Sequence, residues 1–259
     1  MGLLEGKTAL VFGVANDHSI AWGIAKALHA EGATIGFSSV ESLIEKRVAP
    51  LAASIGSTFV EPCDVQSDED IARVFERWGE EHQSLDILVH ALAFAKREDL
   101  SGGFVDTSRD GFALAMDVSA FSLVALTRAA RPYLRRGSSA ITLTYYGAEK
   151  VVTNYNVMGV AKAALEASVR YLAADLGPDG VRVNALSAGP VRTLASAGIA
   201  GFKQLYGTFD EVAPLRSNIT IEDVGRSALY LASDLSSAVT GEVLYVDGGF
   251  NVVGVPTGD

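Results

Sequence analysis

The chain has 259 residues, of which 49% are hydrophobic and 20% charged, a composition ordinary for a globular protein with a substantial core. Lys and Arg number 21 against 31 Asp and Glu, giving a formal net charge of −10 that argues against nucleic acid or an anionic membrane surface as the main partner. Cys63 is the only cysteine, so an intramolecular disulfide is excluded and a reducing compartment fits.

Short apolar runs of strand length alternate along the chain with segments whose apolar residues have helical spacing. The expected strands are Thr8–Phe12, Thr34–Ser38, Thr58–Pro62, Leu85–Val89, Ala140–Leu143, Val181–Leu186 and Glu242–Val246. The expected helices are Ser19–Glu31, Glu41–Ala53, Ser67–Glu81, Asp110–Leu134, a helix carrying Tyr155 that ends near Leu176, and Thr220–Ala232. This alternation predicts an α/β fold, a Rossmann-type doubly wound parallel sheet of about seven strands with helices on both faces.

Residues 1–259 are expected to form a single domain, because no linker, repeat or charge block interrupts the alternation. The one long stretch without strand character is Arg192–Ser217, which follows the end of a strand and is therefore a candidate substrate-binding loop. No unbroken apolar run approaches the roughly 18 residues of a membrane span, and the first residues lack the pattern of a signal peptide. We therefore expect a cytoplasmic protein without a membrane partner.

The first strand is followed by GVANDHSIAWGIA, a turn that leads into a helix. Free N–H groups and the dipole at a helix N-terminus favour an anion such as a pyrophosphate. Gly13 permits the tight turn, Ser19 is the expected N-cap, and Gly23 is expected to let the helix lie close to the sheet. Only two glycines of the common three-glycine fingerprint are present, so an ordinary strand-to-helix loop is the alternative reading.

Three further strand ends offer small residues where a ligand would approach. They are Asp64-Val65, where a carboxylate and an amide could bracket an adenine edge, His90 to Ala93, and Ser187 to Thr193. Together with the first turn they indicate a dinucleotide site.

Tyr155 and Lys162 lie seven positions apart, which at about 100° per residue returns them to nearly the same face of a helix. An ammonium there favours negative charge on the phenol side and can hold a ribose hydroxyl, so the phenol can donate to a carbonyl oxygen that gains charge. For an isolated pair, a surface tyrosine followed by a solvated lysine is the alternative.

The segments GVAxxxSIAxGIA, NYNVMG with Lys162, NALSAGPVRTLAS, TIEDVG and GEVLYVDGGF are the most specific motifs of the chain. Through them essentially the whole chain resembles the short-chain dehydrogenase/reductase superfamily, and within it the bacterial enoyl-acyl-carrier-protein reductases. The resemblance implies NADH-dependent reduction of the trans-2 double bond of enoyl thioesters, the last step of the fatty-acid elongation cycle.

The resemblance also implies roles for individual residues. Tyr155 would donate to the thioester oxygen, Lys162 would hold the nicotinamide ribose, and Tyr145, or Tyr146 if the register differs by one, would line the acyl site. Cofactor contacts carried over by position are Gly13, Ala15, Ser19, Ile20, Asp64, Val65, Ala91, Leu92, Ala93, Lys162, Val191 and Thr193. The acyl pocket would draw on Phe94, Tyr145, Tyr155, Met158, Ala195, Ile199, Phe202 and Leu205, with core packing as the alternative for the apolar members.

Two departures bear on specificity. Ketone-reducing members of the superfamily have their tyrosine at the position of Met158 and a serine at that of Tyr145, which favours a conjugated thioester as the substrate. No Lys or Arg stands at positions 37–43 to meet a 2′-phosphate, and Glu41 would repel one, so we expect NADH rather than NADPH.

The remaining expectations concern partners. The resemblance implies docking of an acidic acyl carrier protein, for which Lys203 is the candidate contact, and a homotetramer. No metal is expected, because the four histidines are dispersed without ligand spacing. The competing functions are a short-chain ketone or sugar dehydrogenase and a non-catalytic Rossmann protein that senses nucleotides.

Overall fold

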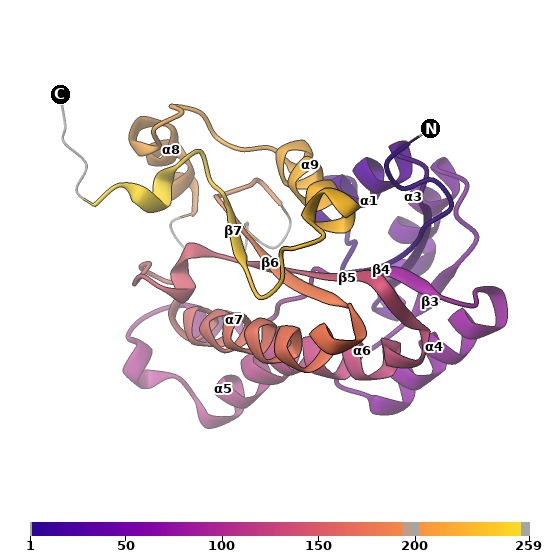
Figure 1. The fold of residues 1–259 in the computed structure, drawn as a ribbon. Helices are drawn as coiled ribbons and strands as arrows, with labels where there is room; N and C mark the ends of the chain where they lie inside the picture. Colours follow the sequence, from indigo (N-terminus) through magenta and orange to yellow (C-terminus); the bar gives the residue numbers. More distant parts are fainter. Residues whose placement is uncertain (1, 194–195, 197–201, 255–259) are drawn as a thin grey trace.

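A parallel sheet forms the central layer of the protein (Figure 1). The computed structural model describes residues 2–193, 196 and 202–254, and only the backbone of 202–205. Within these residues the sheet has seven strands in the order β3-β2-β1-β4-β5-β6-β7, and all neighbours are parallel. The strands are β1 (Thr8–Phe12), β2 (Thr34–Ser39), β3 (Val60–Pro62), β4 (Leu85–His90), β5 (Leu134–Thr144), β6 (Arg182–Ala188) and β7 (Val243–Val246). The predicted fold class is confirmed.

Helices cover both faces of the sheet (Figure 1). One face carries α1 (Ile20–Ala30), the short α2 (Glu41–Leu43), α3 (Ala49–Ser54) and α9 (Ile221–Ala232); the other carries α4 (Asp68–Glu81), α5 (Arg109–Met116), α6 (Ser122–Ala130) and α7 (Asn156–Leu176). Each helical layer has its own apolar core against the sheet, with Ile24, Leu28 and Val224 on the first side and Trp78 and Leu165 on the second. The strands between these layers are buried on both sides, which is why they read as continuous apolar runs.

Capping residues stand at the starts of two helices that the sequence predicts, α4 and α9. The Ser67 hydroxyl accepts a hydrogen bond from the Asp70 N–H, at 3.1 Å, at the start of α4. At the start of α9, Thr220 and Asp223 form a reciprocal capping box. Such caps satisfy N–H groups that the helix leaves free, and each typically stabilises a protein by about 1 kcal/mol.

The order of the strands reverses between β1 and β4. β1 pairs with β2 on one side and with β4 on the other, and Phe12 lies opposite His90 in the last rung of the β1–β4 pair. Connections leave these two strands toward opposite faces of the sheet, so a crevice opens beyond their carboxyl ends. This is where the predicted phosphate-binding turn and the residues after β4 meet.

The helix predicted over Asp110–Leu134 is interrupted. α5 passes through a π-helical turn at Asp117–Phe121 into α6, and a short 3₁₀ turn at Arg131–Tyr133 follows. Leu134 already belongs to β5, so the predicted end was wrong, because Pro132 cannot continue the helix. By length and composition alone, Arg109–Tyr133 would suffice to cross a membrane, but a core helix gives the same pattern, and α5 and α6 pack against α7.

The stretch Arg192–Ser217 contains a helix, α8 (Phe202–Val212), that the sequence did not reveal. Its Phe209 ring stacks on Phe250 with centroids 4.9 Å apart, which ties this helix to the segment after β7. Gly207 within α8 is a poor helix former, so the local sequence masked the helical pattern.

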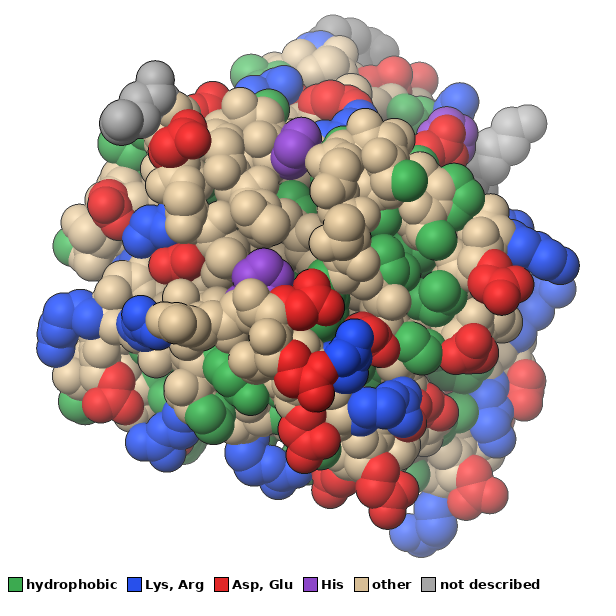
Figure 2. Space-filling view, turned by 90° about the vertical axis from the view of Figure 1, so that its right-hand side faces the viewer, with side chains coloured by type: hydrophobic (Ala, Val, Ile, Leu, Met, Phe, Trp, Pro, Cys, Tyr) green, Lys and Arg blue, Asp and Glu red, His purple; other side chains and the backbone are tan. Residues whose placement is uncertain are grey.

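On the face that Figure 2 shows, acidic and basic side chains are interspersed. Among the described residues, ion pairs join Arg73 to Asp70 and Arg77 to Glu61. On this face the basic side chains form no continuous stripe.

Candidate active site

The turn after β1 passes very close to the chain that follows β4. Gly13 has φ +101°, in the region that favours glycine, and a Cβ there would stand 2.2 Å from the carbonyl oxygen of Ala91. The Gly13 N–H donates to Ser38 O of β2 at 3.2 Å. A side chain is therefore excluded here, and the backbone lies bare at the crevice, as a pyrophosphate site requires.

Ser19 stands at the N-cap position of α1, but its side chain does not cap the helix. Its Oγ instead accepts from the N–H groups of Ala15 and Asn16, both at 3.0 Å. The predicted cap was therefore wrong in its bonding, because the hydroxyl orders the preceding loop. Among the described residues, the N–H groups of Ile20 and Ala21 have no partner, which leaves the start of α1 open to an anion.

Gly23 was expected to let α1 lie close to the sheet, but it lies against the start of α9 instead. A Cβ at this position would stand 2.4 Å from the carbonyl oxygen of Ile221, and one at Gly225 would stand 2.5 Å from that of Gly23. The two glycines therefore let α1 and α9 cross with their backbones in contact. The close approach is between helix and helix, not between helix and sheet.

The ends of β3 and β4 face the same crevice as the first turn. Asp64 is exposed, and its carboxylate accepts from the N–H of Gln66 at 3.0 Å, while Val65 beside it is half-buried. After β4, Ala91 and Leu92 are half-buried and Ala93 is exposed. The sequence-predicted cofactor residues therefore lie where a dinucleotide could run across the strand ends.

His90 is the last residue of β4, at the strand end that borders the crevice. It is fully buried, with Nδ1 2.8 Å from the Thr142 hydroxyl and Nε2 2.8 Å from the Ser122 hydroxyl. Burial, and then the charge of Lys162, lower the pKa of His90 to about 3. Because Ser122 donates to Val118 O, it accepts from Nε2–H, and the neutral ring acts as a structural bridge.

The aromatic pair Tyr145 and Tyr155 lies beyond the end of β5. Their rings are edge to face with centroids 5.0 Å apart, and Tyr155 is 8% exposed. A Cβ on Gly147 would stand 2.5 Å from Cδ1 of Tyr155, so that glycine makes room for the ring. The Tyr146 ring instead packs against Tyr245 and Phe250, so Tyr145 and not Tyr146 is the neighbour of Tyr155.

Burial controls the acidity of both phenols. It raises the pKa of Tyr155 far above its ordinary value, with smaller contributions from Tyr145 and Glu166. It also raises the pKa of Tyr145 to about 12, with a smaller contribution from Asp247. Both groups are therefore hydrogen-bond donors throughout the physiological range.

Lys162 is 5% exposed and lies on the buried face of α7. Its Nζ donates to the carbonyl oxygen of Leu143 at 2.8 Å. Tyr155 immediately precedes the helix, between Asn154 and Asn156, whose φ values of 63° and 40° are positive. The helix predicted to carry Tyr155 therefore begins one residue later, because the positive φ values on both sides of Tyr155 interrupt the helical backbone there. A backbone of this kind persists only where the surrounding structure holds it.

The predicted acyl-site residues are partly brought together. Tyr145, Tyr155 and Met158 form one apolar cluster with other side chains, among them Leu100 and Met116, whereas Phe94 is 52% exposed at its rim. Ala195 and Ile199 lie outside the described residues, whereas Phe202 and Leu205 belong to α8.

After β6, Val191 is buried in the core of the α1 side, and Thr193 and Ser196 bond reciprocally, with the Thr193 N–H 2.9 Å from Ser196 Oγ. The guanidinium of Arg192 lies 4.3 Å from the centre of the Tyr206 ring. Thr193 and Ser196 are therefore tied to each other just after the end of β6.

Two residues of the site escaped sequence reasoning. Ser119, in the π-helical turn, accepts from the Phe94 N–H at 2.9 Å and donates to the Phe94 carbonyl at 3.1 Å, so it fixes the chain at the rim. Glu166 lies buried one turn after Lys162 and accepts from Thr144 at 2.7 Å. An acid on an otherwise apolar helix face was a usable signal for Glu166, whereas nothing in the sequence marks Ser119.

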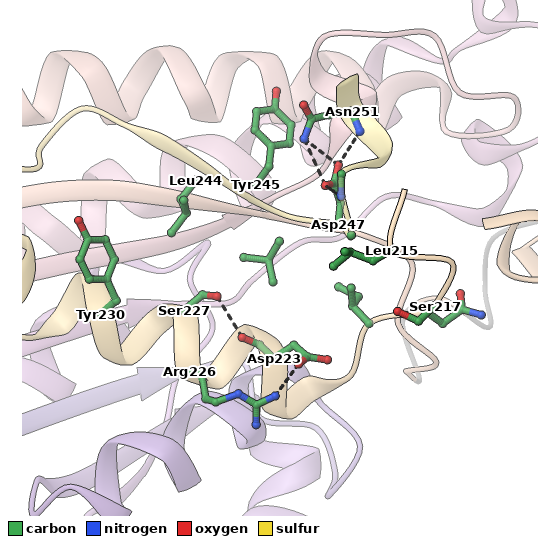
Figure 3. A pocket seen from close by; sticks show the side chains of 15 residues that line it. Leu215, Ser217, Asp223, Arg226, Ser227, Tyr230, Leu244, Tyr245, Asp247 and Asn251 are labelled. Carbon is green, nitrogen blue, oxygen red and sulfur yellow. Dashed lines mark hydrogen bonds and ion pairs between the residues drawn. The ribbon is translucent and has the colours of Figure 1, made fainter. Parts of the chain in front are cut away.

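A second hollow, of about 670 Å³, lies between α9 and β7 (Figure 3). Leu215 and Leu244 line it together with polar groups that pair with one another, Arg226 with Asp223 and Asn251 with Asp247. It contains neither Tyr155 nor Lys162 and belongs to the outer edge of the sheet. Among the described residues, no group of three His, Cys, Asp or Glu side chains could hold a metal ion.

A doubly wound sheet with a glycine turn at its switch point and a buried tyrosine and lysine beside it defines a nucleotide-dependent oxidoreductase. The family model described as "Enoyl-(Acyl carrier protein) reductase" matches residues 13–251. The chain therefore belongs to the enoyl-(acyl-carrier-protein) reductase family.

Individual relatives match over nearly their whole length. The enoyl-[acyl-carrier-protein] reductase [NADH] FabI of Aquifex aeolicus is 53% identical over 98% of this chain and 95% of that protein. The Bacillus cereus enoyl-acyl carrier protein reductase solved with NADP⁺ and indole naphthyridinone is 50% identical, with a TM-score of 0.96 over 98% of this chain and 100% of that one. The Anaplasma phagocytophilum reductase solved with NAD is 50% identical, with a TM-score of 0.95 over 99% and 98%.

Proposed function

We propose that the protein is an NADH-dependent enoyl-acyl-carrier-protein reductase that reduces the trans-2 double bond of enoyl thioesters, in the last step of fatty-acid elongation. The observation that carries the proposal is the buried Tyr155 against Tyr145, with Lys162 on the buried face of the next helix, in a chain of this family. The resemblance of the motifs and the names of the relatives agree with it.

The residues present fit a dinucleotide. The turn at Gly13, which has no side chain, and the open N–H groups of Ile20 and Ala21 at the start of α1 suit a pyrophosphate. Asp64 and Val65 are the candidates for the adenine, and the residues after β4, with Val191 and Thr193, for the nicotinamide half. When bound, the reduced nicotinamide supplies the hydride that goes to C3 of the enoyl group.

Tyr155 acts on the thioester. Its phenol, kept protonated by burial, donates a hydrogen bond to the thioester oxygen as that oxygen gains enolate charge. Lys162 uses one of its three N–H groups on Leu143 O, which leaves two for ribose hydroxyls, and its positive charge favours the enolate. Tyr145 packs against the donor ring and lines the acyl site, where Met158 and Phe94 would contact the chain.

The preference for NADH follows from the end of β2. Val40 is exposed and Glu41 begins α2, so the residues that follow β2 include a carboxylate, and positions 37–43 include no cation to bind a 2′-phosphate. The relatives are named for NADH, although one solved relative holds NADP⁺. A higher kcat/KM with NADPH than with NADH would contradict this preference.

The substrate is expected to arrive on acyl carrier protein, with Lys203 as the candidate contact, and the protein to work in the cytoplasm without nucleic acid or membrane as a partner. A homotetramer is supported by β7, a half-buried strand at the edge of the sheet, and by the apolar side chains of Leu215 and Val252, which are 74% and 75% exposed. Sedimentation as a monomer at micromolar concentration would refute the tetramer, and an unaffected Lys203→Glu variant would refute the carrier contact.

The decisive experiment follows NADH absorbance with crotonyl-CoA and, separately, acetoacetyl-CoA as the surrogate substrate. An enoyl reductase oxidises NADH with the first and not with the second. A ketone or sugar dehydrogenase reverses that preference, and a nucleotide-sensing protein leaves NADH unchanged with both. Met158 and Tyr145 at the positions of the ketone-reducing tyrosine and serine favour the first outcome.

A further inference from the structure

Glu166 is a buried carboxyl group on the helix face that carries Lys162. It lies four residues further along α7, is 6% exposed, and has Leu165 and Val169 as apolar neighbours on the same face. Residues four apart on a helix are neighbours. A buried carboxyl group lowers stability unless its environment supports it, so its presence here requires partners.

The end of β5 holds both residues of this pair. Thr144 donates to Oε1 of Glu166 at 2.7 Å, and the preceding Leu143 accepts from Nζ of Lys162 at 2.8 Å. Two successive residues of the strand thus bind the two ends of one helical turn. Tyr145, which packs on Tyr155, is the next residue of the chain.

The charge of Glu166 affects the pKa of Lys162. Burial lowers the pKa of Lys162 to about 8, and the charge of Glu166 acts in the opposite direction. Burial raises the pKa of Glu166, whereas the hydrogen bond from Thr144 and the charges of Arg170 and Lys162 favour its ionised form. The ammonium that the reaction needs is thus supported by the carboxylate beneath it.

No other described charge does the same for Lys162. The remaining titratable groups that face the pair from the packed elements are His90 of β4, Tyr155, Glu149, Arg170 of α7 and Tyr245 of β7. His90 is neutral, and Glu149 faces Glu166 and accepts a hydrogen bond from Tyr245. Glu166 is the one charged group that raises the pKa of the lysine.

We propose that Glu166, held by Thr144, is a positioning residue that keeps Lys162 charged for the ribose of the bound dinucleotide. This inference rests on the proposed function, since it requires Lys162 to bind that ribose. Glu166 itself contacts neither the substrate nor the cofactor in this role.

The test is the pH dependence of NADH affinity, measured by the fluorescence of bound NADH from pH 6.5 to pH 9.5. Glu166→Gln keeps an acceptor for Thr144 and removes the charge. In this variant NADH affinity is expected to fall with a midpoint about one pH unit lower than in the wild type. At pH values above the midpoint, the protonated fraction of Lys162 falls about tenfold for each pH unit.

Glu149→Gln is the matched control, because it neutralises a carboxyl group that faces Glu166 but does not act on Lys162. Its midpoint is expected to equal that of the wild type. Glu166→Asp keeps the charge one methylene further back, and its midpoint is expected between those of the wild type and Glu166→Gln.

Equal midpoints in Glu166→Gln and the wild type would overturn the proposal, and so would an equally large displacement in Glu149→Gln. In case Glu166→Gln does not fold, a wild-type midpoint in Glu166→Asp overturns it alone. A wild type that binds no NADH at all would refute the proposed function instead, and that result is recognised before any variant is measured.

Discussion

Lys162→Met is expected to abolish the enzyme's proposed chemistry and to stabilise the fold. Burial lowers the pKa of this lysine from 10.5 to about 8, which at about 1.36 kcal/mol for each pH unit corresponds to roughly 3 kcal/mol of folding free energy at neutral pH. The lost hydrogen bond to Leu143 O and the lost attraction to Glu166 reduce the gain. A net stabilisation of about 1 to 2 kcal/mol remains.

The lowered pKa of Lys162 determines how the stability difference between wild type and variant changes with pH. Below pH 8 the lysine is protonated in both the folded and the unfolded chain, so burial of the ammonium destabilises the wild type in full. Between pH 8 and pH 10.5 the folded protein releases the proton first, and the wild type regains stability. The advantage of the methionine variant is therefore expected to be greatest near pH 7 and to shrink as the pH rises toward 10.

The assay is urea unfolding followed by circular dichroism at several pH values, with wild type and variant at one fixed protein concentration because assembly affects apparent stability. A free-energy difference that stays constant from pH 7 to pH 10 would refute the reasoning. A variant that is less stable than the wild type at pH 7 would refute it as well.

Three further outcomes are expected. Tyr155→Phe should lower kcat with an enoyl thioester by about 10²- to 10³-fold while the Kd for NADH, measured by fluorescence, stays unchanged; undiminished turnover would exclude this phenol as the donor. Gly13→Ala should lower stability by more than about 1 kcal/mol and weaken NADH binding, since its Cβ would meet the Ala91 oxygen at a positive φ; unfolding and binding titrations measure both. Cys63 should resist a thiol reagent in the native protein and react in urea, because burial raises its pKa to about 12; rapid native labelling would contradict this.

The sheet and most helix starts could be predicted because their signals are local. Apolar runs mark strands buried on both faces, and Ser67 and Thr220 mark helix starts through hydrogen bonds to residues three positions on. These features depend on neighbours along the chain, which a sequence displays directly. The pairing of Tyr155 with Lys162 stays a prediction, since Tyr155 lies just before α7 and only Lys162 lies on its buried face.

Features that depend on distant neighbours could not be predicted. Ser19 looks like a cap, yet the geometry of the turn directs its hydroxyl back to Ala15 and Asn16. Gly23 looked like a contact with the sheet, but only the placement of α9 shows that Ile221 is its neighbour. The bonds of Ser119 to Phe94 arise because a π-helical turn brings together two residues that are 25 positions apart.

The π-helical turn at Asp117–Phe121 has a consequence for comparisons among distant members of this family. A π turn is equivalent to one residue inserted into an α-helix without any change in the flanking structure. A relative with a regular helix at this place would have one residue fewer there, and its alignment with this chain requires a gap within the helix. Without that gap, the residues on one side of the turn are matched one position out of step.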